Sequence, residues 1–310
     1  MNKKLNSAVF TARATHRTNH GGFTMMELLV VIATTGILVV MVLPTLAFSK
    51  AKSQAEYCLS NFNQLAKACA MYASDNQEFY PPNPDDGNTV PRYDWCPGNV
   101  AGWWSLGAGG SPDAGNATYL TNRTYSSLAP YLASSAVPFK CPADWRVCYY
   151  NGKVVPVVRS VSANAGVGTA DASWLSGGSH SGRPSSPVNG PWLNGSHSHM
   201  ANTPYATFGK STSFKNCSPS EIWIYADEDP FSINDSSIAV VAATPTIIDF
   251  PSTRHQNAGC FGFCDGHTEM HRWKSNVFVL QATHAVGLQY QDWYWFASHA
   301  TRSFITGSVP

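Results

Sequence analysis

Four residues with oxygen-bearing side chains lie close together in the C-terminal third of the chain: Asp227, Asp229, Asn234 and Asp235. Carboxylate and amide oxygens that converge in one loop suit a hard cation. These residues are therefore candidate calcium ligands, and a solvated acidic turn that binds no metal is the alternative. No cofactor is otherwise expected.

A second set of residues that could do chemistry is His255, followed by nine residues and then by Asp265-Gly266. Asp-Gly is a strong hairpin signal, because both central positions of the turn tolerate positive φ. We expect His255 to hydrogen-bond or pair with Asp265 across this hairpin and to hold its turn. A catalytic or metal-binding role for the histidine is the less favoured alternative.

A zinc site built from the same region is disfavoured by its spacing. The ligands would be His255, Cys260, Cys264 and His267. Zinc knuckles and ribbons pair their ligands two to four residues apart across a tight turn at each end. Cys260 and Cys264 have that spacing but fall on an expected strand.

Eight cysteines are enough for a disulfide framework if the chain is exported. Cys58 and Cys69 would lie roughly 16 Å apart on one helix and cannot bridge each other. Cys141 and Cys148 enclose only six residues and are the disulfide candidates. No Ser-His-Asp signature, HExxH motif, P-loop or pair of catalytic carboxylates is evident, so no enzymatic activity is expected.

The element that organises the chain lies at its N-terminus. Residues 28–48 carry no charge, and as a helix they would extend roughly 32 Å, enough to cross a bilayer core. We expect a membrane span at about residues 25–48. The preceding leader, residues 1–22, has four basic residues and no acid, so it should stay cytoplasmic while the rest of the chain lies outside.

The junction between leader and span resembles a known processing site. Gly22-Phe23-Thr24, then Glu27 and an apolar run, resembles the class III leader of type IV pilins and type II secretion pseudopilins. Pro44 falls where such pilins commonly carry a helix-kinking proline. The resemblance implies a prepilin peptidase that cuts after Gly22 and methylates the new amino group of Phe23. It also implies that Glu27 sets register when the apolar helices assemble into a filament.

Beyond the span, the helix should continue as an amphipathic segment over residues 49–76, because apolar residues recur there at spacings of three and four. The whole N-terminal helix would cover residues 23–76. A globular extracytoplasmic head should follow at residues 77–310, with long loops at 83–215 and strands mainly in its C-terminal third. The expected fold class is therefore α+β: a pilin-like long helix, membrane-spanning in its first half, packed on an antiparallel sheet.

The head also carries a resemblance of its own. The spacing from His255 to Asp265-Gly266 is similar to the H-X9-DG element of prepilin-like proteins abundant in Planctomycetes and Verrucomicrobia. Further segments that resemble motifs of these proteins are residues 58–65, 141–144 and 227–230.

Together these features predict a structural, pseudopilin-like subunit of a type II secretion or type IV pilus-like filament, anchored by one span in the inner membrane. The implied partners are the prepilin peptidase, other copies or related pseudopilins, and the inner-membrane platform of the secretion or pilus machine. The net charge of +1 favours no nucleic-acid partner. The alternative is a pilin-anchored domain that binds a ligand or carbohydrate, for example through Trp103, Trp104, Trp174 and Trp192, or less plausibly hydrolyses it.

Overall fold

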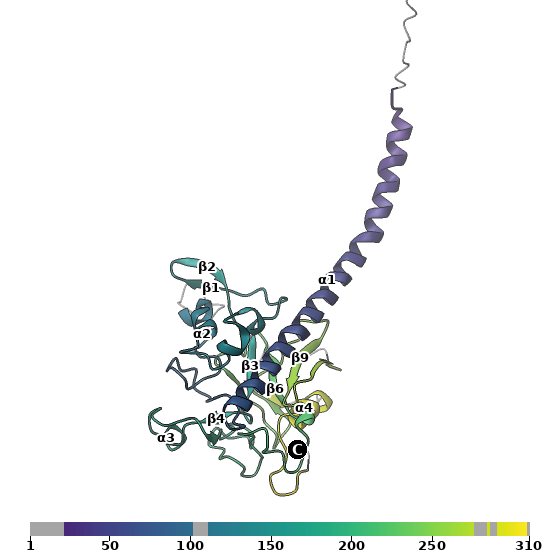
Figure 1. The fold of residues 1–310 in the computed structure, drawn as a ribbon. Coiled ribbons are helices and arrows are strands. Elements are labelled where there is room, and N and C mark those ends of the chain that lie inside the picture. The colour runs from purple at the N-terminus through teal and green to yellow at the C-terminus, as the bar shows by residue number, and fades with distance from the viewer. Residues whose placement is uncertain (1–21, 102–110, 276–283, 286–289, 309–310) are drawn as a thin grey trace, which may run out of the picture. The chain divides into compact units, whose positions relative to one another are not determined.

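The computed structural model describes residues 22–101, 111–275, 284–285 and 290–308 (Figure 1). The chain forms two compact units, Met1–Ser49 and Lys50–Pro310. The expected basic leader, up to residue 21, lies outside the described residues. The fold class is α+β, with a long N-terminal helix and a head built on a mixed sheet.

Helix α1, Met25–Asp75, begins in the first unit. Large apolar side chains between residues 23 and 43 are each at least 47% exposed, and this part of α1 is long and apolar enough to cross a membrane. The backbone is helical at Pro44 as well. The hydroxyls of Thr34 and Thr35 donate to the carbonyls of Val30 and Val31 at 2.9 and 2.8 Å, so these polar groups are satisfied within the helix.

Within the second unit, α1 is amphipathic. Its buried side chains follow the spacing that the sequence predicts: Cys58, Phe62, Leu65 and Cys69. The helix ends at Asp75, and the next turn places Gln77 and Glu78 at φ of 59° and 66°. The apolar stripe of α1 is thus the part that the head covers.

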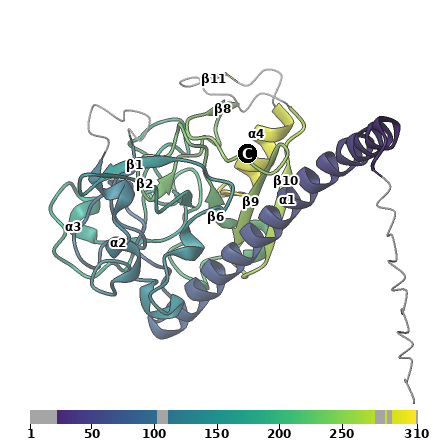
Figure 2. The ribbon, with the colours of Figure 1, turned by 90° about the horizontal axis from the view of Figure 1, so that it is seen from above.

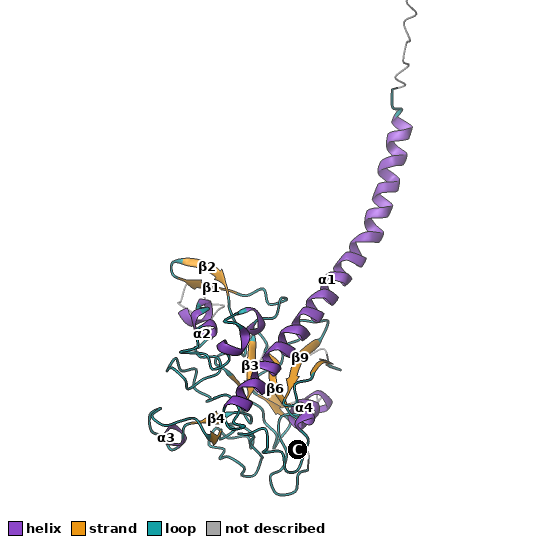
Figure 3. Cartoon of the chain, in the orientation of Figure 1, coloured by secondary structure: helices purple, strands orange, loops and turns teal. Residues whose placement is uncertain are grey.

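The core of the head is a five-stranded sheet. Figure 2 labels its strands β6, β9 and β10, and Figure 3 labels β3, β6 and β9. Its strands, in spatial order, are β10 Thr268–Arg272, β9 Ala258–Phe263, β6 Trp223–Asp227, β3 Val161–Asn164 and β7 Ser237–Ile238. Neighbouring strands are antiparallel except β3 and β7, which are parallel. The sheet is therefore mixed, where a purely antiparallel one was expected.

The two faces of the sheet bury different sets of side chains. A Cβ atom at Gly262 of β9 would lie 3.6 Å from the Phe62 ring, which identifies the face covered by α1. On the opposite face Phe261 contacts Phe296 of helix α4, Tyr290–Ser298, and Trp223 of β6 stacks on the same ring at 5.2 Å. The alternation of side chains along a strand produces these two cores, one on each side of the sheet.

The hairpin predicted at Asp265-Gly266 is confirmed. It joins β9 to β10, with Thr268 paired to Gly262, and Gly266 has φ of +95°. By contrast, β3 lies inside the region expected to be loops. Its residues, Val-Ser-Ala-Asn, are short and half polar, so they carry no strand pattern, although all four are buried.

The remaining elements are short. The small strands are β1 Val147–Tyr150, β2 Lys153–Pro156, β4 Thr169–Ala170, β5 Ser186–Pro187, β8 Thr246–Ile247 and β11 His284–Ala285. The short helices are α2 Thr118–Thr121 and α3 Ala172–Leu175, with single 3-10 turns at η1 Pro112–Gly115, η2 Ala129–Leu132, η3 Val137–Phe139 and η4 Pro219–Glu221. The part of residues 83–215 that the structure describes is mostly loop, as expected.

Candidate functional site

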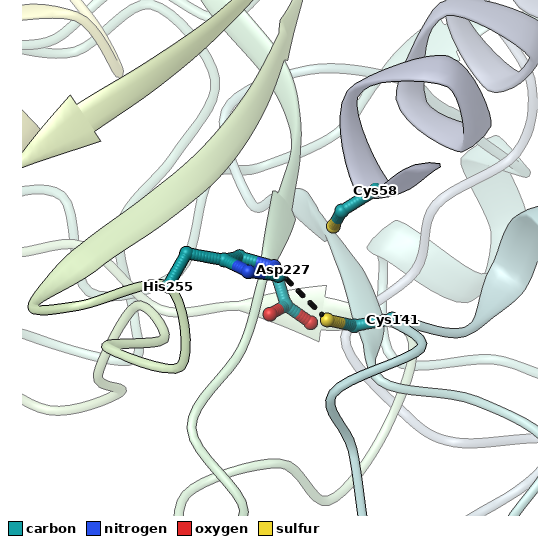
Figure 4. Close-up of side chains that lie close together, drawn as sticks. All are labelled: Cys58, Cys141, Asp227 and His255. Carbon is teal, nitrogen blue, oxygen red and sulfur yellow. Dashed lines mark hydrogen bonds between the residues drawn. The ribbon is translucent and has the colours of Figure 1, made fainter. Parts of the chain in front are cut away.

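Four side chains that can bind a metal converge in the interior of the head: Cys58, Cys141, Asp227 and His255 (Figure 4). One sulfur, nitrogen or oxygen atom from each lies within 4.8 Å of those of the other three, and all four residues are buried. We call this group the buried Cys/Asp/His cluster. It is the only group of three or more such side chains at this separation in the part of the chain that the structure describes.

Each member of the cluster comes from a different element. Cys58 lies on the buried stripe of α1, and Cys141 follows turn η3. Asp227 is the last residue of β6. His255 lies in the turn before β9, where the next two residues have φ of 56° and 62°. The fold therefore brings the cluster together through tertiary packing of four segments.

Hydrogen bonds fix the relative positions of these side chains. The Nε2 atom of His255 lies 3.2 Å from the Sγ atom of Cys141. The hydroxyl of Ser160 donates to Oδ1 of Asp227 at 2.7 Å and accepts from the backbone N–H of Cys141 at 2.9 Å. Ser160 thus connects two members of the cluster.

A chain of buried charges lies beside the cluster. Nη1 of Arg254 is 2.7 Å from Oδ2 of Asp227, and Nη2 of Arg254 is 4.0 Å from Oδ1 of Asp144. Asp144 also forms an ion pair of 2.7 Å with Arg146. The side chains of both acids are fully buried. Burial raises the pKa of Asp144, but its contacts with Arg146 and Arg254 outweigh this and lower that pKa.

The surroundings shift the pKa values of the cluster. Contact with Cys58, followed by burial, raises the pKa of the Cys141 thiol well above its usual range. The hydrogen bond with Cys141 lowers the pKa of Cys58, but contact with Cys260 and burial outweigh it and raise that pKa. Burial lowers the pKa of His255, yet its contact with Cys141 and the charge of Asp227 prevail, so the pKa is raised. These surroundings therefore favour the protonated form of both thiols.

The structure gives His255 and Asp265 different partners, in contrast to the expected pairing. His255 contacts Cys141, whereas Oδ1 of Asp265 lies 2.6 Å from Nδ1 of His267 within the exposed turn. The six residues of β9 separate the two, which corresponds to roughly 20 Å of extended chain. The nine residues between them therefore include strand β9. His255 lies before this strand, and Asp265 lies in the turn after it.

The candidate calcium ligands do not converge either. Oδ1 of Asp229 accepts the Phe231 N–H at 3.0 Å, and Oδ1 of Asp235 accepts the Ser237 N–H at 2.8 Å, so each caps its own turn. Asn234 is exposed. Asp227 is the exception, because its carboxylate belongs to the buried Cys/Asp/His cluster.

The eight cysteines are all free thiols in this structure. Cys141 and Cys148, the expected disulfide pair, lie in two separate hydrophobic clusters. Between them Arg146 turns back on Asp144 with three hydrogen bonds, and this turn directs the two thiols to different cores. The Cys260 thiol contacts Cys58, so of the disfavoured zinc set His255 belongs to the cluster and Cys260 adjoins it.

At the start of α1, the residues of the expected processing site are exposed. Gly22 and Phe23 precede the helix. Glu27 and Thr24 form a reciprocal cap: the Thr24 N–H and hydroxyl donate to Oε2 of Glu27 at 2.9 and 2.8 Å, and the Glu27 N–H donates to the Thr24 hydroxyl at 3.2 Å. This is the capping-box arrangement that starts a helix.

Two of the four tryptophans considered for carbohydrate binding have aromatic partners within the protein. Trp174 stacks on His180 at 5.5 Å, and Trp192 meets His197 edge-on at 5.7 Å. Trp103 and Trp104 lie outside the described residues. The two described rings therefore pack against neighbouring loops.

The chain was also compared with known proteins. No family model, curated protein or solved structure matches it.

Sequence reasoning singled out the segments that meet at the cluster but not the site itself. The segments that begin at Cys58, Cys141, Asp227 and His255 are the four that stand out in the sequence of the head and of the helix before it. Each supplies its first residue to the cluster. A search for one common site among these four positions, instead of four local ones, would have found it.

Proposed function

We propose that this chain is a structural subunit of a membrane-anchored filament of the type IV pilin and type II secretion pseudopilin class. A prepilin peptidase would cut it after Gly22, and the assembled filament would contain other copies or related subunits. The basic leader would stay in the cytoplasm, so the head, which follows the membrane span, would lie on the other side of the inner membrane.

The observation that supports this proposal most directly is the change of character along α1. One continuous helix, Met25–Asp75, is apolar and exposed in its first half and amphipathic with a buried stripe in its second. Exposed apolar surface of this extent requires a lipid or protein partner. Before assembly, lipid would cover this apolar surface. In the filament, the same half of α1 in neighbouring subunits would cover it.

The position of Glu27 fits this role. Its carboxylate lies in the first turn of α1, just before the uncharged run of residues 28–48 and four residues after Phe23, whose amino group cleavage after Gly22 would create. In a filament, that amino group on one subunit and Glu27 on another would pair in surroundings of low dielectric and select one register.

Mass spectrometry of the N-terminus of the membrane-extracted protein tests this proposal. The expected peptide begins with methylated Phe23. A mature protein that still begins at Met1, or one cut after the apolar segment, would overturn it. The matched control is Gly22→Ala against Gly21→Ala: only the first change alters the residue at the cut, so only the first should leave the leader attached.

A further inference from the structure

We propose that the buried Cys/Asp/His cluster binds one zinc ion in a closed, structural site. The inference is independent of the filament proposal, because it concerns only the interior of the head.

The donor set points to zinc. Two sulfurs, an imidazole nitrogen and a carboxylate oxygen are the ligand types of tetrahedral Zn²⁺ sites, whereas Ca²⁺ and Mg²⁺ take oxygen ligands. Four protein ligands leave no position open for water or substrate, which is the pattern of a structural site. The cluster supplies one donor atom from each of its four residues.

The distances need only a small contraction. With zinc bonds of about 2.0 to 2.3 Å, tetrahedral ligand atoms lie about 3.3 to 3.8 Å apart. The four atoms here lie within 4.8 Å of one another, and His255 Nε2 lies 3.2 Å from Cys141 Sγ. Small side-chain rotations would therefore close the shell around an ion.

The charges also balance. The Asp227 carboxylate is already paired with the Arg254 guanidinium, at 2.7 Å. When Zn²⁺ enters, the Cys58 and Cys141 thiols each release one proton and become thiolates. The two positive charges of the ion would replace the two protons that these thiols release.

A disulfide between Cys58 and Cys141 is the competing fate of the two sulfurs, since their thiols are in contact. It would use neither the His255 nitrogen nor the Asp227 carboxylate. Zinc accounts for all four side chains, and the bridge formed by Ser160 between Asp227 and the backbone of Cys141 is the kind of outer contact that positions metal ligands.

The bound ion would cross-link separate elements of the head. Its ligands come from α1, from the segment after η3, from the end of β6 and from the turn before β9. A bound ion would therefore cross-link the buried half of α1 to the sheet of the head, and its binding free energy would add to folding stability.

The first test uses the full chain, extracted in detergent and supplied with zinc. Metal analysis should give about one zinc per chain, with both Cys58 and Cys141 unbridged in the peptide map. Cys58→Ser should lose the zinc. The matched control is Cys69→Ser, since Cys69 is a buried cysteine on the same helix but outside the cluster; it should keep the metal. Absence of zinc from the wild-type chain, a Cys58–Cys141 disulfide, or equal loss in both variants would overturn the proposal.

A second measurement needs no variant and so does not depend on whether Cys58→Ser folds. Cobalt added to the metal-free wild-type chain should produce a thiolate-to-metal charge-transfer band and the intense visible bands of tetrahedral Co²⁺. Zinc should then displace the cobalt and abolish both. A weak octahedral spectrum without the thiolate band would contradict a site made from two cysteines.

Discussion

The Nε2 atom of His255 lies 3.2 Å from the Sγ atom of Cys141, although 114 positions separate the two residues in the chain. The contact exists only when the turn before β9 and the segment after η3 pack together beside α1. The site is thus a product of the assembled head. Any change that loosens its surroundings should be visible first in the properties of these two side chains.

Ser160→Ala should weaken zinc binding without removing a ligand. The substitution deletes the hydroxyl that joins the Asp227 carboxylate to the backbone of Cys141. Loss of such an outer contact typically costs about 10- to 100-fold in metal affinity. Competition titration with a chromophoric chelator measures the change. Ser162→Ala is the control, because Ser162 follows Ser160 by two residues, in β3, and its hydroxyl donates to the Asp235 carbonyl. Equal effects of the two changes would contradict the assigned role.

The long helix was predictable because its signals are local. An uncharged run of 21 residues and a stripe at spacings of three and four determine α1, and both can be read without knowing its partners. The hairpin at Asp265-Gly266 was predictable for the same reason.

The cluster was not predictable in this way, because its geometry depends on sheet order. Sequence proximity paired His255 with Asp265, but the six residues of β9 lie between them, while β6 brings Asp227 from another part of the chain. The strand β3, with its weak pattern, completes the sheet that makes this possible. Local sequence patterns do not predict contacts between distant segments.

Two glycines of β9 should respond differently to a methyl group. At Gly259 an added Cβ would lie 2.9 Å from the backbone oxygen of Ser252, which cannot move aside easily. At Gly262 the nearest atoms are 3.6 Å away, an ordinary contact with Phe62. We expect Gly259→Ala to lower the free energy of unfolding by about 1 to 3 kcal/mol, and Gly262→Ala to change it by no more than about 0.5 kcal/mol. Chemical unfolding followed by tryptophan fluorescence compares the two variants. A larger loss of stability in Gly262→Ala than in Gly259→Ala would contradict the close approach of Gly259 to the Ser252 backbone.

Asp235 should make the head less stable as the pH rises. Burial, and then the nearby charge of Asp85, raises the pKa of Asp235 to about 7 from 3.8. Between these values the unfolded chain releases the proton that the folded head retains, so folding stability falls with increasing pH and the loss is complete above pH 7.

Asp235→Asn removes this titration while keeping the oxygen that accepts from the Ser237 N–H. The variant should be more stable than the wild type by on the order of 1 to 3 kcal/mol at pH 8, with little difference at pH 4. Thermal unfolding across this range measures the effect. Glu56→Gln, on the exposed side of α1, serves as the control and should show no such trend. If Asp235→Asn were more stable than the wild type only at low pH, titration of Asp235 would not explain the pH dependence.

The reciprocal cap between Thr24 and Glu27 makes it possible to separate two roles of the glutamate. If Glu27 acts only as a cap, Glu27→Gln should impair filament assembly no more than Thr24→Ala does. Thr24→Ala removes the hydroxyl that accepts the Glu27 N–H and should cost about 0.5 to 2 kcal/mol at the start of the helix. Glu27→Gln retains an oxygen for the Thr24 N–H but removes the charge.

We expect Thr24→Ala to assemble nearly as well as the wild type, and Glu27→Gln to remain in the membrane as unassembled subunits. Quantifying sheared or pelleted filament against membrane-bound protein distinguishes the two, with the processed N-terminus checked in each variant. The difference arises because a cap needs only a hydrogen-bond acceptor, whereas pairing with the amino group of Phe23 on another subunit needs a negative charge. Equal assembly by both variants would remove the electrostatic role of Glu27 and leave it as the local start signal of α1.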